Sequence, residues 1–116
     1  MMYALYQGLL NLTDEGIENA WDRHLKAHNY LSKGLDDLDL KFLVDKDDRL
    51  PSLNAIVIPD GIDDIKTRLS LLNDFNIEIG GGLGPFAGKI WRIGLMGYSA
   101  HKRHIDTLLS AFKNIL

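Results

Sequence analysis

The sequence predicts an α+β domain in which helices pack on one face of a small, mainly antiparallel sheet. Four segments carry apolar residues at the helical spacing of three or four, and short apolar runs bounded by turn residues alternate with them, as strands do. The chain has 116 residues, which is enough for one hydrophobic core but not for two. We therefore expect a single domain over residues 1–116.

The N-terminal third predicts two helices. Residues 2–11 indicate a short helix, and Thr13 is the expected N-cap of a second one, because two acidic residues follow it where the helix dipole favours negative charge. Apolar side chains then recur between Ile17 and Leu38 and predict a helix that ends near residue 37.

The remaining segments predict the sheet and two further helices. The first two strands flank a charged turn and are expected to pair antiparallel. The expected strands are 40–44, 52–58, 77–79 and 89–95, and the expected helices are 62–75 and 101–115.

Charge and cysteine content exclude several classes of function. The chain has no cysteine, which excludes disulfides, thiolate metal sites and a cysteine nucleophile, and favours a cytoplasmic location. The net charge is −3, and the one dense basic group, His101–His104, is too small to bind a nucleic acid. The start of the chain, Met1–Leu12, has the pattern of neither a signal peptide nor a membrane span. We therefore expect neither nucleic-acid nor membrane binding.

The glycines are unevenly distributed, since seven of the eleven fall between Gly80 and Gly97. A P-loop would need glycine and Ser or Thr where Leu83 and Ile90 stand, and a dinucleotide-binding loop would have to open a helix, whereas a strand is expected next. Both phosphate-binding interpretations fail. Two others stay open: a wide connection with residues at positive φ, and a loop held close to a ligand.

Arg92 stands inside an otherwise apolar strand. Alternation places Ile90, Arg92 and Gly94 on one face of the strand. It places Trp91, Ile93 and Leu95 on the other face, which is expected to point into the core. Gly94 leaves open space beside the guanidinium, which could then clamp a carboxylate through two hydrogen bonds. The residues alone favour the plainer alternative, an arginine on a solvent-facing strand.

Histidines and aspartates give no metal or catalytic site. The pairs His24/His28 and His101/His104 have ligand-like spacing, but neither has a third ligand at a characteristic distance, so we expect surface histidines on helices. The clustered aspartates stand at expected helix and turn ends, where they form local hydrogen bonds and are solvated. These are Asp36, Asp37, Asp39, Asp45, Asp47 and Asp48.

Several segments together resemble one enzyme family. Leu50–Ala55, Ile58–Gly61, Ile77–Pro85 and Gly88–Gly97 look like the C-terminal part of the serine-pyruvate and alanine-glyoxylate aminotransferases, which are class V, fold-type I pyridoxal-phosphate enzymes. Leu5–Leu35 is similar to the family segment that enters the small domain. The resemblance covers nearly the whole chain.

This resemblance implies roles that the residues alone leave open. Arg92 would bind the α-carboxylate of amino-acid and keto-acid substrates, and residues 1–38 would be a helical lead-in from a large domain to an α/β core at 39–116. The lysine that forms the Schiff base with pyridoxal phosphate, and the groups that hold the cofactor, belong to the large domain of the family. The resemblance therefore implies no catalytic, cofactor-binding or metal-binding residue in this chain.

The expected function is thus the C-terminal segment of an aminotransferase that takes alanine or serine as donor and glyoxylate or pyruvate as acceptor. The complete enzyme would be a homodimer with pyridoxal phosphate, and the chain alone would be inactive and bind no cofactor. The alternative is a stand-alone amino-acid-binding module with a regulatory or oligomerisation role.

Overall fold

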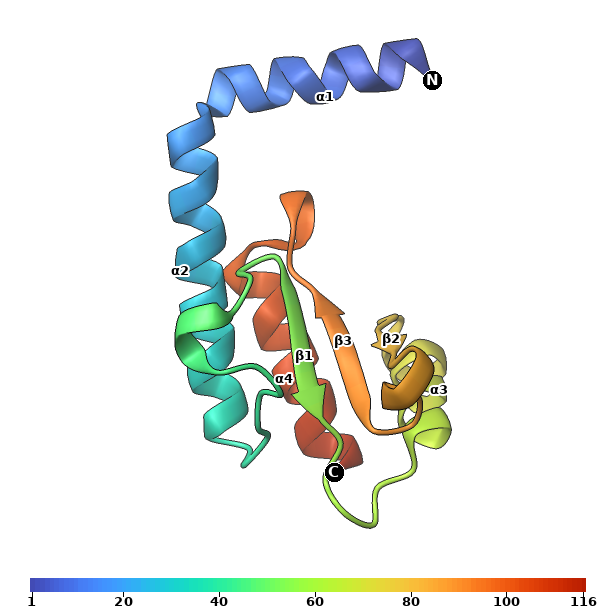
Figure 1. Ribbon diagram of the computed structural model, residues 1–116. Coiled ribbons are helices and arrows are strands. Elements are labelled where there is room, and N and C mark those ends of the chain that lie inside the picture. Colours follow the sequence, from blue (N-terminus) through green and yellow to red (C-terminus); the bar gives the residue numbers. More distant parts are fainter.

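The computed structural model describes all 116 residues and contains four α-helices and three strands (Figure 1). Three short 3-10 turns, at 46–48, 84–86 and 97–99, lie in the connections. None of the helices combines the length and the apolar character needed to cross a membrane. The elements are α1 (Met2–Glu15), α2 (Ile17–Asp36), β1 (Leu53–Val57), α3 (Asp64–Phe75), β2 (Gly80–Gly81), β3 (Ile90–Gly94) and α4 (Lys102–Ile115).

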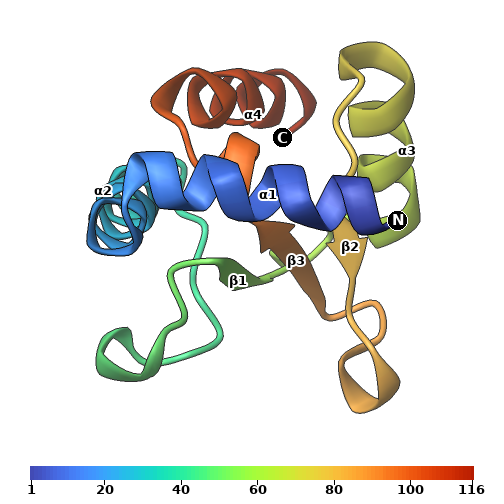
Figure 2. The same ribbon diagram turned by 90° about the horizontal axis from the view of Figure 1, so that it is seen from above.

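The strands form one antiparallel sheet in the order β1-β3-β2, so the predicted α+β class is confirmed. In the register, Ala55 of β1 and Gly80 of β2 both pair with Arg92, which therefore lies on the central strand. Helices α2 and α4 pack together behind the sheet, and α3 lies beyond its β2 edge (Figures 1 and 2). The opposite face of the sheet carries no helix.

The core lies between the sheet and these helices. Trp91 is fully buried on the core face of β3 and stacks on Phe112 of α4, with ring centroids 5.4 Å apart. Ile93 and Leu95 are also buried, which confirms the predicted alternation along this strand. Leu31 and Leu35 bring α2 into the same cluster.

The first two helices join at Gly16 and not at Thr13. Thr13 lies within α1, where its hydroxyl donates to the carbonyl of Leu9 (2.7 Å), so its predicted role as an N-cap is wrong. Gly16 has a φ of 87°, a conformation that residues with a side chain rarely adopt, and it ends α1 and begins α2. The chain turns sharply there, and α1 projects away from the sheet (Figure 1).

The predicted strand 40–44 is reduced to a single antiparallel bridge between Phe42 and Ile56. Two backbone hydrogen bonds, Leu43 N–H to Ala55 O and Val57 N–H to Lys41 O, complete it. The predicted antiparallel pairing is therefore right, but its length is wrong. Pairing stops because the residues after Phe42 are largely exposed and bury little apolar surface against the domain.

The predicted strand 77–79 is also wrong, because the end of α3 takes up the backbone N–H of its first residue, Ile77. Asn76 adopts the left-handed conformation and the N–H of Ile77 donates to the carbonyl of Leu71 (3.0 Å), which is the Schellman ending of a helix. At the other end, the side chain of Asp63 accepts from the N–H of Lys66 and caps the helix. Pairing with β3 begins only at Gly80.

Asp64 ties α3 to the sheet. Its carboxylate accepts a hydrogen bond from Nε1 of the buried Trp91 (3.1 Å) and forms an ion pair with Arg68 (2.8 Å). The hydrogen bonds from Arg68 lower the pKa of the Asp64 carboxyl, and the bond from Trp91 contributes in the same direction. One side chain thus holds two elements together.

Replacing Asp64 with alanine is expected to destabilise the domain. The substitution leaves the Trp91 N–H without its partner, a loss of about 1–3 kcal/mol for a buried donor. Asp74→Ala is the matched control, because Asp74 is exposed on the same helix and accepts only from Ser70. Urea denaturation of both variants measures the difference, and equal midpoints would contradict the role of Asp64.

The lowered pKa of the Asp64 carboxyl predicts how the stability of the domain depends on pH. Because its pKa is lower in the folded chain, Asp64 contributes stability above the unfolded pKa of about 3.9, and that contribution is lost as the pH falls through the folded pKa. The wild type should therefore lose more stability than Asp64→Ala on acidification from pH about 5 to about 3. A constant difference between the two proteins over this window would contradict the prediction.

Candidate functional site

Arg92 is half-buried, and alternation along β3 places it opposite the core-facing Trp91 and Ile93. That face of the sheet is not covered by a helix (Figure 2). The Nε of Arg92 donates to the carbonyl oxygen of Gly81 (2.7 Å), and this is its one hydrogen bond within the chain. No carboxylate lies within ion-pair distance of it, whereas Arg23 and Arg68, which are also half-buried, are paired with Glu15 and Asp64. The two terminal nitrogens of Arg92 are therefore free to donate to a ligand from outside the chain.

The space around Arg92 is formed by glycines. A β-carbon built at Gly80 would lie 3.2 Å from Nη2 of Arg92, which is tighter than ordinary contact, and at Gly94 it would meet only Met96 Cε at 3.7 Å. Gly94 thus borders open space, as the sequence predicted.

The glycine cluster combines two physical requirements. Gly84 and Gly88 have φ values of 55° and 75°, so they are the turn glycines that the wide-connection interpretation expects. Gly82 has an ordinary φ, but a β-carbon there would collide with the carbonyl of Phe86. The loop therefore folds back tightly on itself and covers Ile90, which is 6% exposed although it lies on the same face as Arg92.

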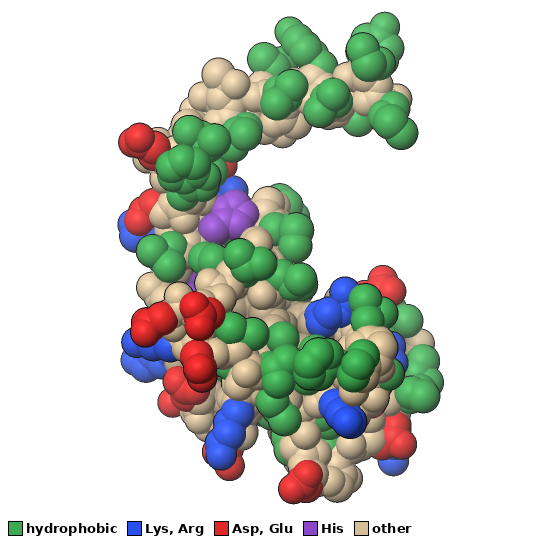
Figure 3. All heavy atoms as spheres, viewed as in Figure 1, with side chains coloured by type: hydrophobic (Ala, Val, Ile, Leu, Met, Phe, Trp, Pro, Cys, Tyr) green, Lys and Arg blue, Asp and Glu red, His purple; other side chains and the backbone are tan.

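Helix α1 carries a second uncovered apolar surface. None of its residues is buried, hydrophobic side chains project from it, and an open hollow separates it from the rest of the molecule (Figure 3). Its orientation is fixed at Glu15, which forms an ion pair with Arg23 of α2 (2.5 Å), and Arg23 in turn donates to the carbonyl of Gly97 (2.7 Å). The hydrogen bond from Arg23 lowers the pKa of the Glu15 carboxyl. The exposed large hydrophobic side chains of α1 are Met2, Tyr3, Leu5, Tyr6, Leu9, Leu10 and Leu12.

His24 and His28, two of the four histidines, form hydrogen bonds within the fold, and His28 is not on the surface. His28 is buried, and its Nδ1 lies 2.8 Å from Oδ1 of Asn54, so the expectation of a surface histidine is wrong there. The Asn54 amide also donates to the carbonyls of Pro51 and Ile93, which leaves its Oδ1 to accept from His28. Alternation along β1 could have revealed this pair, because it places Asn54 on the core face with Ile56.

His24 uses both ring nitrogens in hydrogen bonds. Nδ1 lies 2.6 Å from the carbonyl of Ala20, and Nε2 accepts from the backbone N–H of Gly97 (2.9 Å). His24 is therefore not available as a metal ligand. Nowhere in the chain do three His, Asp or Glu side chains converge to hold a metal ion.

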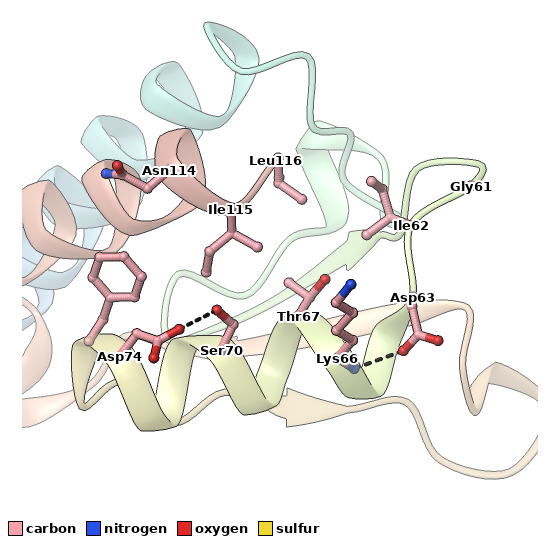
Figure 4. Close-up of a pocket in the computed structure, with 11 residues that line it drawn as sticks. Gly61, Ile62, Asp63, Lys66, Thr67, Ser70, Asp74, Asn114, Ile115 and Leu116 are labelled. Atoms are coloured by element: carbon pink, nitrogen blue, oxygen red, sulfur yellow. Dashed lines mark hydrogen bonds between the residues drawn. The ribbon is translucent and has the colours of Figure 1, made fainter.

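A pocket of about 530 Å³ lies between α3 and the C-terminal end of α4 (Figure 4). None of its lining residues belongs to β2 or β3. The hydrogen bonds drawn in it, Ser70 to Asp74 and the Lys66 N–H to Asp63, are local to α3 and its cap. Since no buried side-chain polar atom lacks a partner, the pocket presents no group that calls for a ligand.

Comparison with known proteins identifies the relatives of the chain, although no family model matches it. It is 40% identical to the alanine–glyoxylate aminotransferase of Rattus norvegicus, and 38% identical to the (S)-ureidoglycine–glyoxylate transaminase of Bacillus subtilis, over 116 residues in each case. The crystal structure of the alanine–glyoxylate aminotransferase of Nostoc sp. superposes with a TM-score of 0.94 at 46% identity, covering 97% of this chain and 30% of that one.

The chain is homologous to the C-terminal part of these class V aminotransferases. It spans about 28% of the length of the curated relatives it matches. The aminotransferase resemblance predicted from the sequence is confirmed, and so is the small-domain type of fold.

Substitution can distinguish the two requirements for glycine in the cluster, which are a positive φ at Gly88 and close packing at Gly82. Asparagine tolerates positive φ, so Gly88→Asn is expected to cost less than about 1 kcal/mol. Gly82→Asn places a β-carbon against the Phe86 carbonyl, and overpacking of this kind costs about 1–3 kcal/mol. Urea denaturation compares the two variants. A larger loss at Gly88 would show that backbone conformation, and not close packing, limits the loop.

Proposed function

We propose that this chain is the small-domain part of a cytoplasmic, pyridoxal-phosphate-dependent aminotransferase in which Arg92 binds the carboxylate of the substrate. The observation that carries the proposal is the free guanidinium fork of Arg92 on the uncovered sheet face. Charge-assisted hydrogen bonds of such a fork to a carboxylate contribute about 1.5–3 kcal/mol each. Every α-amino acid and α-keto acid carries that carboxylate, so one arginine serves both halves of a transamination.

The names of the relatives narrow the proposed substrates. The rat and Bacillus proteins are named for different amino donors, alanine and (S)-ureidoglycine, but both names contain glyoxylate. We therefore propose glyoxylate as the acceptor, with alanine or serine as donor and pyruvate as the other candidate acceptor. Glyoxylate consists of little beyond an aldehyde and a carboxylate, so its recognition depends strongly on the arginine.

The chemistry itself is assigned to a large domain outside this chain. Pyridoxal phosphate supplies the electron sink for transamination, and the enzyme must add a lysine that is partly desolvated. All eight lysines of this chain are exposed. The hydrogen bond to Asp106 raises the pKa of Lys102, whereas a Schiff-base lysine requires a lowered pKa. The residues present do not fit the cofactor, and this supports a cofactor site elsewhere.

The partner of the chain in this proposal is that large domain. Residues 1–38 lead in from it, and residues 39–116 form the α/β core, onto which α2 packs. The uncovered apolar side chains of α1 and the open face around Arg92 are the two surfaces that it would cover. We also propose that the complete enzyme is a homodimer, as the family resemblance implies.

The role of Arg92 predicts the effect of a conservative substitution in the complete enzyme. Arg92→Lys retains the charge but not the planar fork, so KM for both amino acid and keto acid should rise roughly 10- to 100-fold. Arg49→Lys is the matched control, because Arg49 is also half-buried without a carboxylate partner but stacks on Phe42. Steady-state kinetics with alanine and glyoxylate measures both variants, and an unchanged KM for Arg92→Lys would sink the assignment.

The proposal also predicts that the 116-residue chain does not retain pyridoxal phosphate. After incubation with the cofactor and gel filtration, the protein fraction should lack the visible absorbance of a bound cofactor and should not transfer an amino group from alanine to glyoxylate. A chain that retains the cofactor absorbance and is active would overturn the assignment of cofactor binding and catalysis to the large domain. Binding of alanine to a colourless chain, with no large domain encoded upstream, would favour the stand-alone module instead.

A further inference from the structure

We propose that Gly80 and Gly81, the two residues of β2, are positioning residues that fix the guanidinium of Arg92. This inference rests on the proposed function only for its effect on substrate binding, because the contacts themselves are present in the chain. Gly81 contributes its carbonyl, which accepts from Nε of Arg92 (2.7 Å). Gly80 contributes the absence of a side chain.

The slot at Gly80 is specific to Arg92. The three heavy atoms nearest to a β-carbon built at Gly80 all belong to this arginine: Nη2 at 3.2 Å, Nε at 3.4 Å and Cβ at 3.5 Å. Gly80 has an ordinary φ, so no turn requires glycine at this position. The missing side chain therefore serves the approach of the guanidinium to the β2 backbone.

A second guanidinium holds β2 from the other side. A β-carbon at Gly81 would lie 3.2 Å from Cζ of Arg68, and Arg68 is fixed by its ion pair with Asp64. Asp64 also accepts from Trp91, the neighbour of Arg92 on β3. Strand β2 thus lies between two guanidinium groups, and the Gly81 carbonyl is bonded to one of them.

This arrangement determines how Arg92 can bind a carboxylate. Because Nε is committed to Gly81, the sideways approach that uses Nε and one terminal nitrogen is blocked. The end-on approach through Nη1 and Nη2 remains, and it directs the carboxylate outward from the strand. Gly80 and Gly81 thereby select one of the two bidentate geometries of an arginine.

The contact is tested first in the 116-residue chain, without reference to activity. Gly80→Ala and Gly80→Val should accelerate hydrogen exchange of the Arg92 Nε–H in a graded way, by roughly fivefold or more for valine, as one net hydrogen bond is lost. Gly94→Ala is the matched control, since Gly94 lies on the same face but borders open space. Side-chain NMR measures the rates, and equal rates in all four proteins would overturn the proposal.

A double-mutant cycle covers the case in which Gly80→Val folds poorly. The urea midpoint should fall for Gly80→Val when Arg92 is present and should be nearly unchanged in an Arg92→Ala background, because the valine then meets no guanidinium. An equal fall in both backgrounds would show that Gly80 serves the sheet and not Arg92, and would overturn the proposal.

Kinetics of the complete enzyme then separates this inference from the proposed function. Gly80→Val should raise KM for alanine and glyoxylate about tenfold while kcat changes much less, since a displaced fork weakens binding of the carboxylate common to ground and transition states. Faster Nε–H exchange with an unchanged KM would leave the positioning role standing and refute the substrate role of Arg92. Unchanged exchange would refute the positioning role whatever KM does.

Discussion

The carboxylate of Asp64 is the point on which the sheet edge depends. It accepts from Trp91 on the central strand and pairs with Arg68 on its own helix, so a single group joins α3 to β3. Arg68 in turn packs on Gly81, whose carbonyl holds Arg92. The position of the Arg92 guanidinium is therefore connected, through three consecutive contacts, to one charge at the start of a helix.

Strand β2 shows why this connection needs glycine. Two residues are too few for a strand to be stable through its own pairing, and a pair of glycines adds no side-chain burial. Strand β2 pairs with β3, and an arginine packs against each of its two residues. The absence of side chains, a cost in most strands, here permits two guanidinium groups to approach one backbone segment. The glycine run therefore does not need to be explained as a phosphate-binding loop.

The sequence predicted the fold class, all four helices and the core face of β3, because periodic apolar patterns report directly on burial. It did not predict where Gly16 or Asn76 end their helices, since backbone hydrogen bonds and not hydrophobic spacing decide those positions. The strands at 40–44 and 77–79 failed for a related reason. The residues of both segments favour extended structure. In the first segment, however, the residues after Phe42 bury too little apolar surface to extend the pairing, and in the second the N–H of Ile77 is committed to the helix end.

The candidate site was predictable in part. Alternation placed Arg92 on the face opposite the core, whereas its role as a carboxylate-binding residue was implied only by the family resemblance. The contact with Gly81 depends on the register of β2 with β3, which no local pattern encodes. Asp64 could not be recognised as the anchor either, because its partner Trp91 lies 27 residues away. His28 and Asn54 were recoverable in principle, since both fall on core-facing positions where a polar side chain must find a partner.

The open face around Arg92 determines how strongly its guanidinium can attract a carboxylate. A guanidinium that is half in water attracts a carboxylate weakly, because the effective dielectric constant near a surface is high. The same fork becomes much stronger when a second wall excludes water. In the proposed enzyme, that wall is the large domain, so the small domain supplies orientation and the closed interface supplies strength. An arginine held rigidly by its Nε suits this division, because its geometry is set before the cleft closes and little side-chain entropy remains to be lost on binding.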